Sequence, residues 1–144
     1  MSPEIWTTIE EKFKKHPMLK AEAVPYTEID AAADATGVKL SEDYREFIHR
    51  YGGAIVGSLS IIGLRKAPAM ARTESSVFEV TNHFRRQGWR GVDEWLVISV
   101  DLAGNPIGLA KDGRIWIFDH DAGVVEVIAE SFEGFLRKRC LKMN

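Results

Sequence analysis

The sequence predicts an α+β fold in one domain over residues 1–144, with a mixed, mostly antiparallel sheet of about five or six strands flanked by helices. Three observations predict this class. Apolar residues recur every three or four positions in the first part of the chain and again near its end, as in helices that bury one face. From Trp95 onward, short runs of β-branched and aromatic residues alternate with turn-forming residues. No repeat, low-complexity tract or linker divides the chain.

Two helices are expected before residue 40. The first has an apolar stripe at four-residue spacing, and Ser2 is its expected N-cap. It is expected to end at His16-Pro17, because proline cannot continue the hydrogen-bond ladder. The second is short, with Thr27 as its expected N-cap and Gly37 at its C-terminus. The apolar stripe of the first helix consists of Ile5, Ile9 and Phe13.

The strongest local pattern predicts a helix that begins after Ser41 and stops at Gly52-Gly53. Its large apolar side chains fall at i, i+3, i+4 and i+7, which places them on one face. They are Tyr44, Phe47, Ile48 and Tyr51. We therefore expect this helix to pack against the core.

The middle of the chain predicts two short strands, a loop and a further helix. The strands are expected at 54–56 and 59–64, and the loop at 65–74. Ser76 and Glu79 have the spacing of a capping box for a helix that runs through Gln87, with Gly88 as its C-terminal cap.

The last third predicts a meander of strands and one closing helix. The strands are expected at 95–100, 107–111, 114–118 and 124–128. Asp112-Gly113 is a dipeptide favoured in two-residue hairpin turns, and residues 120–123 predict another turn. Ser131 is the expected N-cap of the closing helix, and Cys140 is expected to lie on its buried side.

Composition excludes several functional classes. The net charge is −2, with 19 basic and 21 acidic residues, so the chain lacks the positive charge that direct binding of nucleic acid requires. No apolar run approaches the roughly 20 residues of a membrane span, and no signal peptide is visible, so we expect a cytoplasmic protein. A single cysteine permits neither an internal disulfide nor a cysteine metal cluster.

The order of motifs resembles a known family. A short helix ends in Gly37-Val38-Lys39-Leu40, the next runs through Glu42 to Ile48, and Tyr51-Gly52-Gly53 follows. This order resembles the opening signature of the SUKH superfamily, the Smi/Knr-like group of bacterial toxin-immunity proteins and fungal cell-wall regulators. Later segments also resemble its central strand, hairpin and closing helix, so the resemblance covers about residues 29–136. Ser41 and Ala33 depart from the pattern, where many members have proline and glutamate.

The resemblance implies a mixed sheet with surrounding helices, no cofactor, and function through protein binding instead of catalysis. It leads us to expect a monomer or weak dimer that binds a protein toxin, a nuclease or another polymorphic toxin, and occludes its active site. The fungal branch implies an alternative, a regulatory or scaffolding module that binds no toxin. A third hypothesis is a metal-dependent enzyme.

The residues offer little support for catalysis. His16, His49 and His83 lie among charged neighbours, where a solvated histidine is the ordinary interpretation. The triplet Asp119-His120-Asp121 has the composition of a metal or proton-transfer site. Adjacent residues rarely converge on one ion, however, and Asp and His are common in turns. Contact with a partner protein and a plain turn therefore remain alternatives.

Two groups of residues are candidates for binding a partner. The first is Arg85, Arg86, Trp89 and Arg90, because Trp and Arg are the side chains most enriched at interface hot spots. The alternatives are arginines that meet a helix dipole and a tryptophan that packs into the core.

The second candidate group lies along the late hairpins and is acidic. It contains Asp112, Asp119, Asp121 and Glu126, with His120 between two of its aspartates. An acidic surface there would match the basic cleft of a toxin that acts on an anionic substrate. A solvated sheet edge is the alternative.

Overall fold

The computed structural model describes residues 1–70 and 76–143, so part of the predicted loop at 65–74 lies outside the described residues. The helices are α1 (Pro3–Lys15), α2 (Tyr26–Thr36), α3 (Glu42–Tyr51), α4 (Val77–Arg86) and α5 (Phe132–Phe135), which continues as a π-helical turn at Leu136–Cys140. The strands are β1 (Ala54–Val56), β2 (Leu59–Ile61), β3 (Trp95–Val100), β4 (Pro106–Ala110), β5 (Ile115–Asp119) and β6 (Val124–Ala129). Short 3-10 turns lie at Pro17–Leu19 and Val92–Glu94.

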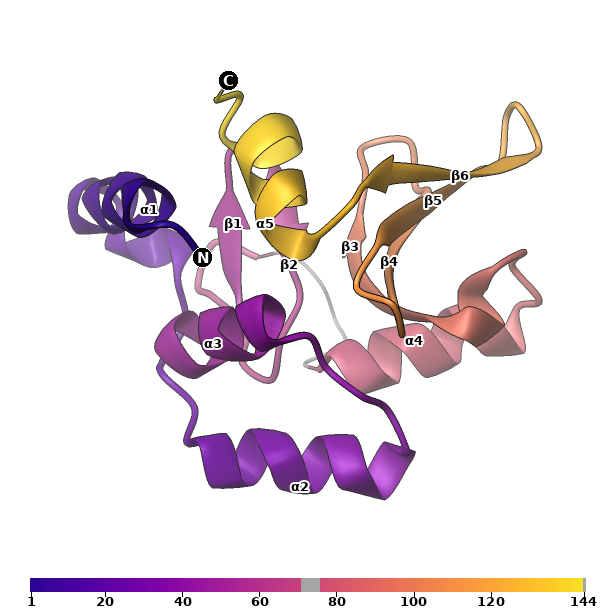
Figure 1. The fold of residues 1–144 in the computed structure, drawn as a ribbon, viewed down its shortest axis with the longest axis horizontal. Helices are drawn as coiled ribbons and strands as arrows, with labels where there is room; N and C mark the ends of the chain where they lie inside the picture. The colour runs from indigo at the N-terminus through magenta and orange to yellow at the C-terminus, as the bar shows by residue number, and fades with distance from the viewer. Residues whose placement is uncertain (71–75, 144) are drawn as a thin grey trace.

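The described strands form two antiparallel sheets (Figure 1). β1 and β2 form a hairpin, and β3, β4, β5 and β6 form a meander in chain order. The amide of Ile62 donates to the carbonyl of Ile98 across 2.8 Å, which joins the end of the hairpin to β3. The predicted α+β class is confirmed, and the division into two sheets is the detail that periodicity alone did not predict.

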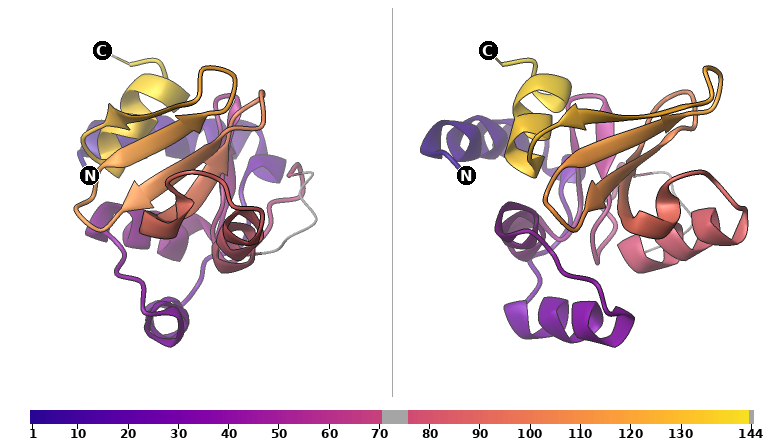
Figure 2. Two further views of the ribbon diagram at one scale, coloured as in Figure 1. Left: turned by 90° about the vertical axis from the view of Figure 1, so that its right-hand side faces the viewer. Right: turned by 45° about the vertical axis from the view of Figure 1, so that its right-hand side comes forward.

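Helices cover the four-stranded sheet on both faces (Figure 2). On one face, α4 packs along β3, and Thr81 links the two elements. Its hydroxyl donates to the carbonyl of Val77 across 2.7 Å and accepts the amide of Val97 across 2.8 Å. On the other face lie α5 and the β1–β2 hairpin, which together with β4 and β5 enclose a hollow that includes Leu59 and Phe135. The second face therefore holds most of the core, and the first carries α4 over only part of the sheet.

Gly37 ends α2 in a left-handed conformation as predicted, and two of the predicted N-caps are confirmed, whereas others are wrong. The hydroxyl oxygen of Ser76 accepts the amide of Glu79 across 3.2 Å, and that of Ser131 accepts the amide of Gly134 across 3.0 Å. The N-cap expected at Thr27 lies two residues earlier, at Pro25, whose backbone is extended, so the helix begins at Tyr26.

Ser2 and Ser41 stand at the N-cap positions but make no capping hydrogen bond. The Ser41 hydroxyl donates to Asp43 instead, across 2.7 Å. The turn expected to contain two residues at Asp112-Gly113 contains three, residues 111–113. Gly113 there has φ 91°, a left-handed conformation that glycine adopts without strain.

Helix α2 lies on the outside of α3 (Figure 1). It buries Ile29 and Ala33, and two pairs of charged side chains also attach it. Arg45 donates to both carboxylate oxygens of Asp30 across 2.8 Å, and Arg65 donates to both oxygens of Glu28 across 2.7 and 2.8 Å. The hydrogen bonds from Arg45 hold the pKa of the Asp30 carboxyl below its usual range, and those from Arg65 do the same for Glu28.

Acid is expected to weaken the attachment of α2. A carboxyl whose folded-state pKa is lowered stabilises the fold above its unfolded pKa, and that contribution is lost as the pH falls below about 4. Asp30→Asn should therefore lose less stability than the parent on acidification. Urea unfolding at several pH values, followed by tryptophan fluorescence, measures this difference. An equal loss in parent and variant would contradict the role given to the Arg45–Asp30 pair.

Removing either of two buried hydroxyls, those of Thr81 and Ser99, is expected to have a different effect on the stability of the fold. Thr81→Val leaves the amide of Val97 without its acceptor and is expected to cost about 1–3 kcal/mol. Ser99 is fully buried, and its hydroxyl has no hydrogen-bond partner among the described residues, so Ser99→Ala is expected to be neutral or stabilising. Thermal unfolding of both variants provides the comparison. A Ser99→Ala variant as unstable as Thr81→Val would show that the Ser99 hydroxyl has a partner in solution.

Candidate functional site

The face of the sheet next to α4 carries a row of aromatic residues. Val97, Gly108 and Trp116 stand opposite one another in the register of β3, β4 and β5, so they share a face. Trp95 and Phe118 lie two residues away along β3 and β5 and point to the same face. Because α4 packs on β3, the aromatic residues of β5 remain partly exposed.

Two glycines make room for Trp95. A Cβ at Gly108 would lie 2.4 Å from the Cβ of Trp95, and a Cβ at Gly91 would lie 2.6 Å from its ring. The indole therefore lies against both glycines, with the ring of Trp116 nearly parallel at 6.3 Å between centroids. Beside these rings is a hollow of about 440 Å³. It is lined by Gly91, Glu94, Trp95, Ala110, Lys111, Asp112, Trp116 and Val125.

The segment after α4 folds over the other end of the row. The ring of Trp89 makes edge-on contacts with Phe118 at 5.9 Å and with His120 at 5.7 Å between centroids. Arg90 donates to the carbonyl of Gly123 across 3.1 Å, and its guanidinium lies 5.7 Å from the centre of the Phe118 ring. A second hollow, of about 340 Å³, is lined by Gln87, Gly88, Trp89, Arg90, Phe118 and His120.

We define the aromatic surface as the aromatic side chains that border these two hollows, together with Arg90. It consists of Trp89, Arg90, Trp95, Trp116, Phe118 and His120. Residues 89–95 and 116–120 are separated in sequence and meet only in the folded chain. Apolar rings, one arginine and hydrogen-bonding groups at the rim have the composition of a protein-binding hot spot.

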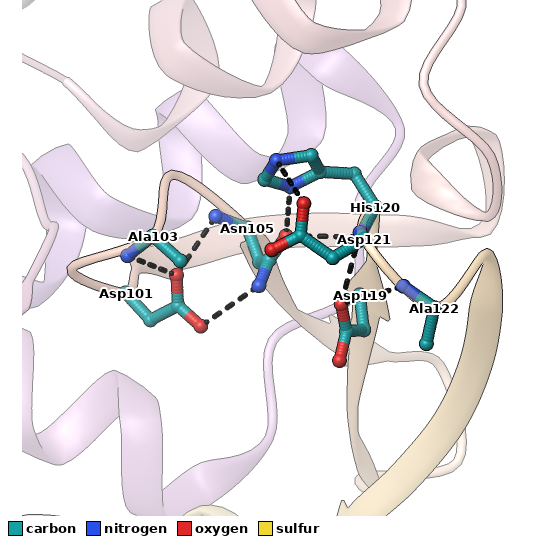
Figure 3. Close-up of polar contacts among 7 residues, drawn as sticks. All are labelled: Asp101, Ala103, Asn105, Asp119, His120, Asp121 and Ala122. Carbon is teal, nitrogen blue, oxygen red and sulfur yellow. Dashed lines mark hydrogen bonds and ion pairs between the residues drawn. The ribbon is translucent and has the colours of Figure 1, made fainter.

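A buried amide holds His120 in place (Figure 3). The side-chain nitrogen of Asn105 donates to Asp101 across 3.1 Å, and its oxygen accepts the backbone amide of His120 across 3.0 Å. The same oxygen contacts Nδ1 of the His120 ring. Because the Asp101 carboxylate only accepts, the amide orientation is fixed, and Nδ1 of His120 must carry a proton. Nε2 then faces Asp121 at 3.4 Å.

The triplet Asp119-His120-Asp121 forms a turn. The carboxylate of Asp119 accepts the amides of Asp121 and Ala122 across 3.1 and 3.2 Å (Figure 3). Within residues 1–70 and 76–143, no three or more His, Cys, Asp or Glu side chains are placed to hold a metal ion together. The geometry therefore gives the metal-dependent enzyme hypothesis no support, and the charged groups here organise the backbone.

The structure brings together some members of the two candidate groups and separates others. Trp89, Arg90 and His120 meet in the second hollow, with the carboxylates of Asp119 and Asp121 on the adjoining turn. The acidic residues do not form one patch. Asp112 lies at the opposite end of β5, and Glu126 pairs with Ile117, so it points to the other face of the sheet.

Two of the arginines differ in their surroundings. Arg85 donates to the carbonyls of Val92 and Trp95 across 2.9 and 2.8 Å, so its guanidinium holds the segment that carries Trp89 and Arg90. Arg86 is exposed. Arg85 thus stabilises the backbone of the segment that carries part of the aromatic surface, whereas Arg86 is exposed to solvent.

His49 corrects one expectation about the histidines. It is half-buried, its ring stacks on Tyr26 at 3.8 Å between centroids, and its Nδ1 lies 2.7 Å from the carbonyl of Val24. The expectation that it is simply solvated is wrong, because α2 and the segment before it cover this side of α3. Cys140 is buried as expected, and burial raises the pKa of its thiol to about 12.

Sequence reasoning missed three residues that matter here, namely Asn105, Trp116 and Phe118. The alternation of Trp116 and Phe118 along one strand was a signal that they share a face. Nothing local indicated that Trp89 would meet that face. Asn105 gave only the signal of a turn residue, because its contact with His120 spans 15 positions.

The sequence pattern of the SMI1 / KNR4 family (SUKH-1) matches residues 24–138. The chain belongs to this family. The match includes every residue of the aromatic surface and both turns that hold it. A search of curated proteins finds no match. No described helix combines the length and apolar character needed to cross a membrane.

Asn105 is expected to be essential for the order of the 119–123 turn. Asn105→Ala removes the acceptor of the His120 amide and a donor to Asp101, and is expected to cost about 1–3 kcal/mol. Hydrogen exchange of the His120 amide should become faster. Asn82→Ala, at an exposed position on α4, is the control and should change stability by less than about 0.5 kcal/mol. An unchanged exchange rate at His120 in Asn105→Ala would refute this role.

Proposed function

We propose that this protein is an immunity protein, which binds a polymorphic toxin domain in the bacterial cytoplasm and blocks the toxin's active site without catalysing a reaction. Membership of the SMI1 / KNR4 family (SUKH-1) supports a role of this kind. The single observation that carries the proposal is the convergence of Trp89, Arg90, Phe118 and His120 around one hollow.

The hollow fits one inserted side chain of a partner. Three of its six lining residues, Trp89, Phe118 and His120, are aromatic, so it would bury an apolar or aromatic group and gain from ring contacts. Arg90 borders it and, among the described residues, donates one hydrogen bond, to the carbonyl of Gly123, which leaves its other guanidinium N–H groups for a partner's carboxylate or carbonyl oxygen. Side chains of this kind, held by contacts on several sides, bind without a large loss of rotamer freedom.

Charge around the hollow would govern the approach of the toxin. Asp119 and Asp121 lie on the turn next to His120, and the Asp121 side chain is 81% exposed. A toxin that acts on an anionic substrate has a basic cleft, and acidic groups at the rim would speed association with it. In this arrangement the aromatic hollow provides affinity, and the aspartates provide attraction and orientation.

Co-expression with the cognate toxin tests the proposal. The partner to test is a toxin domain encoded by a neighbouring gene. Cells that carry both proteins should grow, and the purified proteins should form a one-to-one complex. Failure to protect, together with failure to bind, would refute the immunity role. Binding of a different cellular protein without any protection would favour the regulatory or scaffolding alternative.

Variants of the aromatic surface test its part in binding. Trp89→Ala is expected to weaken toxin binding by about 2 kcal/mol or more, roughly thirtyfold, and Arg90→Glu by roughly tenfold. Isothermal titration calorimetry measures both, with circular dichroism to show that the variants fold.

Matched controls lie on the other face of the sheet. Arg139 lines the hollow beside α5, and Leu102 is 91% exposed at the same hollow. Arg139→Glu and Leu102→Ala should bind the toxin as the parent does. Weakened binding in the controls, with full affinity in Trp89→Ala and Arg90→Glu, would place the interface on the opposite face.

A further inference from the structure

The face of the four-stranded sheet next to α5 carries an apolar hollow that is separate from the aromatic surface. Ile107 of β4 and Ile117 of β5 stand opposite each other and share this face, whereas Trp116 and Phe118 point to the other one. The hollow has a volume of about 360 Å³. Its apolar lining includes Leu59, Ile107, Ile117, Ile128 and Phe135. An apolar chain placed here would therefore lose contact with water.

Two cations border the hollow. Arg139 and Lys142 line it from the C-terminal segment, both are exposed, and neither forms an ion pair among the described residues. Asp101 also lines the hollow, but its carboxylate accepts the amides of Ala103 and Asn105 and the side-chain nitrogen of Asn105. The charges of the two cations thus remain available to an anionic group at the mouth of the hollow.

The backbone at Lys142 is in a conformation that favours glycine. Its φ is 56°, the left-handed region that commonly follows the last turn of a helix. The amide of Met143 donates to the carbonyl of Arg137 across 2.7 Å, which closes this turn. A side chain in this conformation costs free energy that glycine would avoid. The chain therefore has a lysine beside the hollow at a cost to stability, which is typical of residues that serve binding.

The mouth of the hollow is held in place on two sides. A Cβ at Gly57 would lie 2.0 Å from the carbonyl oxygen of Cys140, so the β1–β2 turn lies directly against the C-terminal segment. The amide of Leu141 donates to the carbonyl of Leu136 across 2.8 Å. In the β3–β4 turn, Leu102 lines the hollow while most of its side chain remains exposed. Leu102 and the aliphatic stems of the two cations would be partly buried by a bound apolar chain.

We propose that this hollow binds a fatty acid, with its apolar chain against the isoleucines of β4, β5 and β6 and its carboxylate between Arg139 and Lys142. A head group with a single negative charge is favoured, because Asp101 also borders the hollow and would repel a second one. The site lies on the opposite face of the sheet from the aromatic surface. It does not depend on the proposed immunity role.

NMR titration of the full chain with sodium octanoate tests the site. The amide signals of residues 58–59, 101–103 and 139–142 should shift, with a Kd on the order of 1 mM. The control is 1-octanol, which has the same chain without the charge and should bind at least about fivefold more weakly. Decanoate should bind about tenfold more tightly than octanoate, because two further CH₂ groups are buried.

Variants of the two cations test the recognition of the carboxylate. Arg139→Glu should weaken octanoate binding about tenfold. Lys142→Gly should weaken it about threefold without lowering the Tm, because it removes a cation and also relieves the left-handed backbone. Lys138→Glu is the matched control, since it makes the same charge reversal at an exposed position outside this hollow. It should leave the Kd unchanged.

Four results would overturn the proposal. The first is the absence of any shift up to about 10 mM octanoate. The second is equal affinity for octanoate and 1-octanol, which would show that the cations do not recognise the carboxylate. The third is a set of shifts confined to the hollow beside Trp95 and Trp116. The fourth is an equal effect of Arg139→Glu and Lys138→Glu, which would attribute the change to net charge alone.

Discussion

The buried amide of Asn105 is the constraint on which the rest of the site depends. It is only 5% exposed and lies between the turn that follows β3 and the turn that follows β5. The Asp101 carboxylate accepts from its amide nitrogen, so its oxygen must face His120. Removing either hydrogen-bond partner of an amide this deeply buried would destabilise the fold. The two hydrogen bonds therefore fix the orientation of the Asn105 side chain. The position of His120 is therefore fixed from the interior of the protein.

The aromatic surface follows from that anchor and from two glycines. His120 contacts the ring of Trp89, which in turn contacts Phe118, so three elements meet around one hollow. Because Gly91 and Gly108 have no side chains, the indole of Trp95 can lie against both of them. A rigid surface of large rings loses little entropy when a partner binds, which is the property that an inhibitor acting by occlusion needs. Family membership and surface geometry thus support the same kind of function.

The sequence predicted the local elements well and the long-range contacts poorly. Tyr44, Phe47, Ile48 and Tyr51 all lie on the buried face of α3, as their spacing indicated. Residues 95–100 form β3 with the predicted bounds. Helical and strand periodicities depend on neighbours a few residues apart, so the chain itself contains the information.

The misses have a common physical cause. His49 was expected to be solvated, but Tyr26 covers it, and Asn105, which was not selected as a candidate, holds His120. Each of these contacts joins segments at least 15 positions apart, and no periodic pattern encodes such pairs. Trp89 and His120 were both selected from composition. Trp89 lies in a segment rich in arginine and tryptophan, and His120 lies in a triplet with the composition of a metal or proton-transfer site. That they share one hollow depends on how the strands pair.

Hydrogen exchange of the complex between this protein and its cognate toxin tests the central claim most directly. The account predicts that toxin binding slows exchange in residues 87–91 and 116–123, the two segments that build the second hollow, and leaves α2 unchanged. Protection confined to α2 or to the face covered by α5, with no change in residues 87–91 and 116–123, would contradict it.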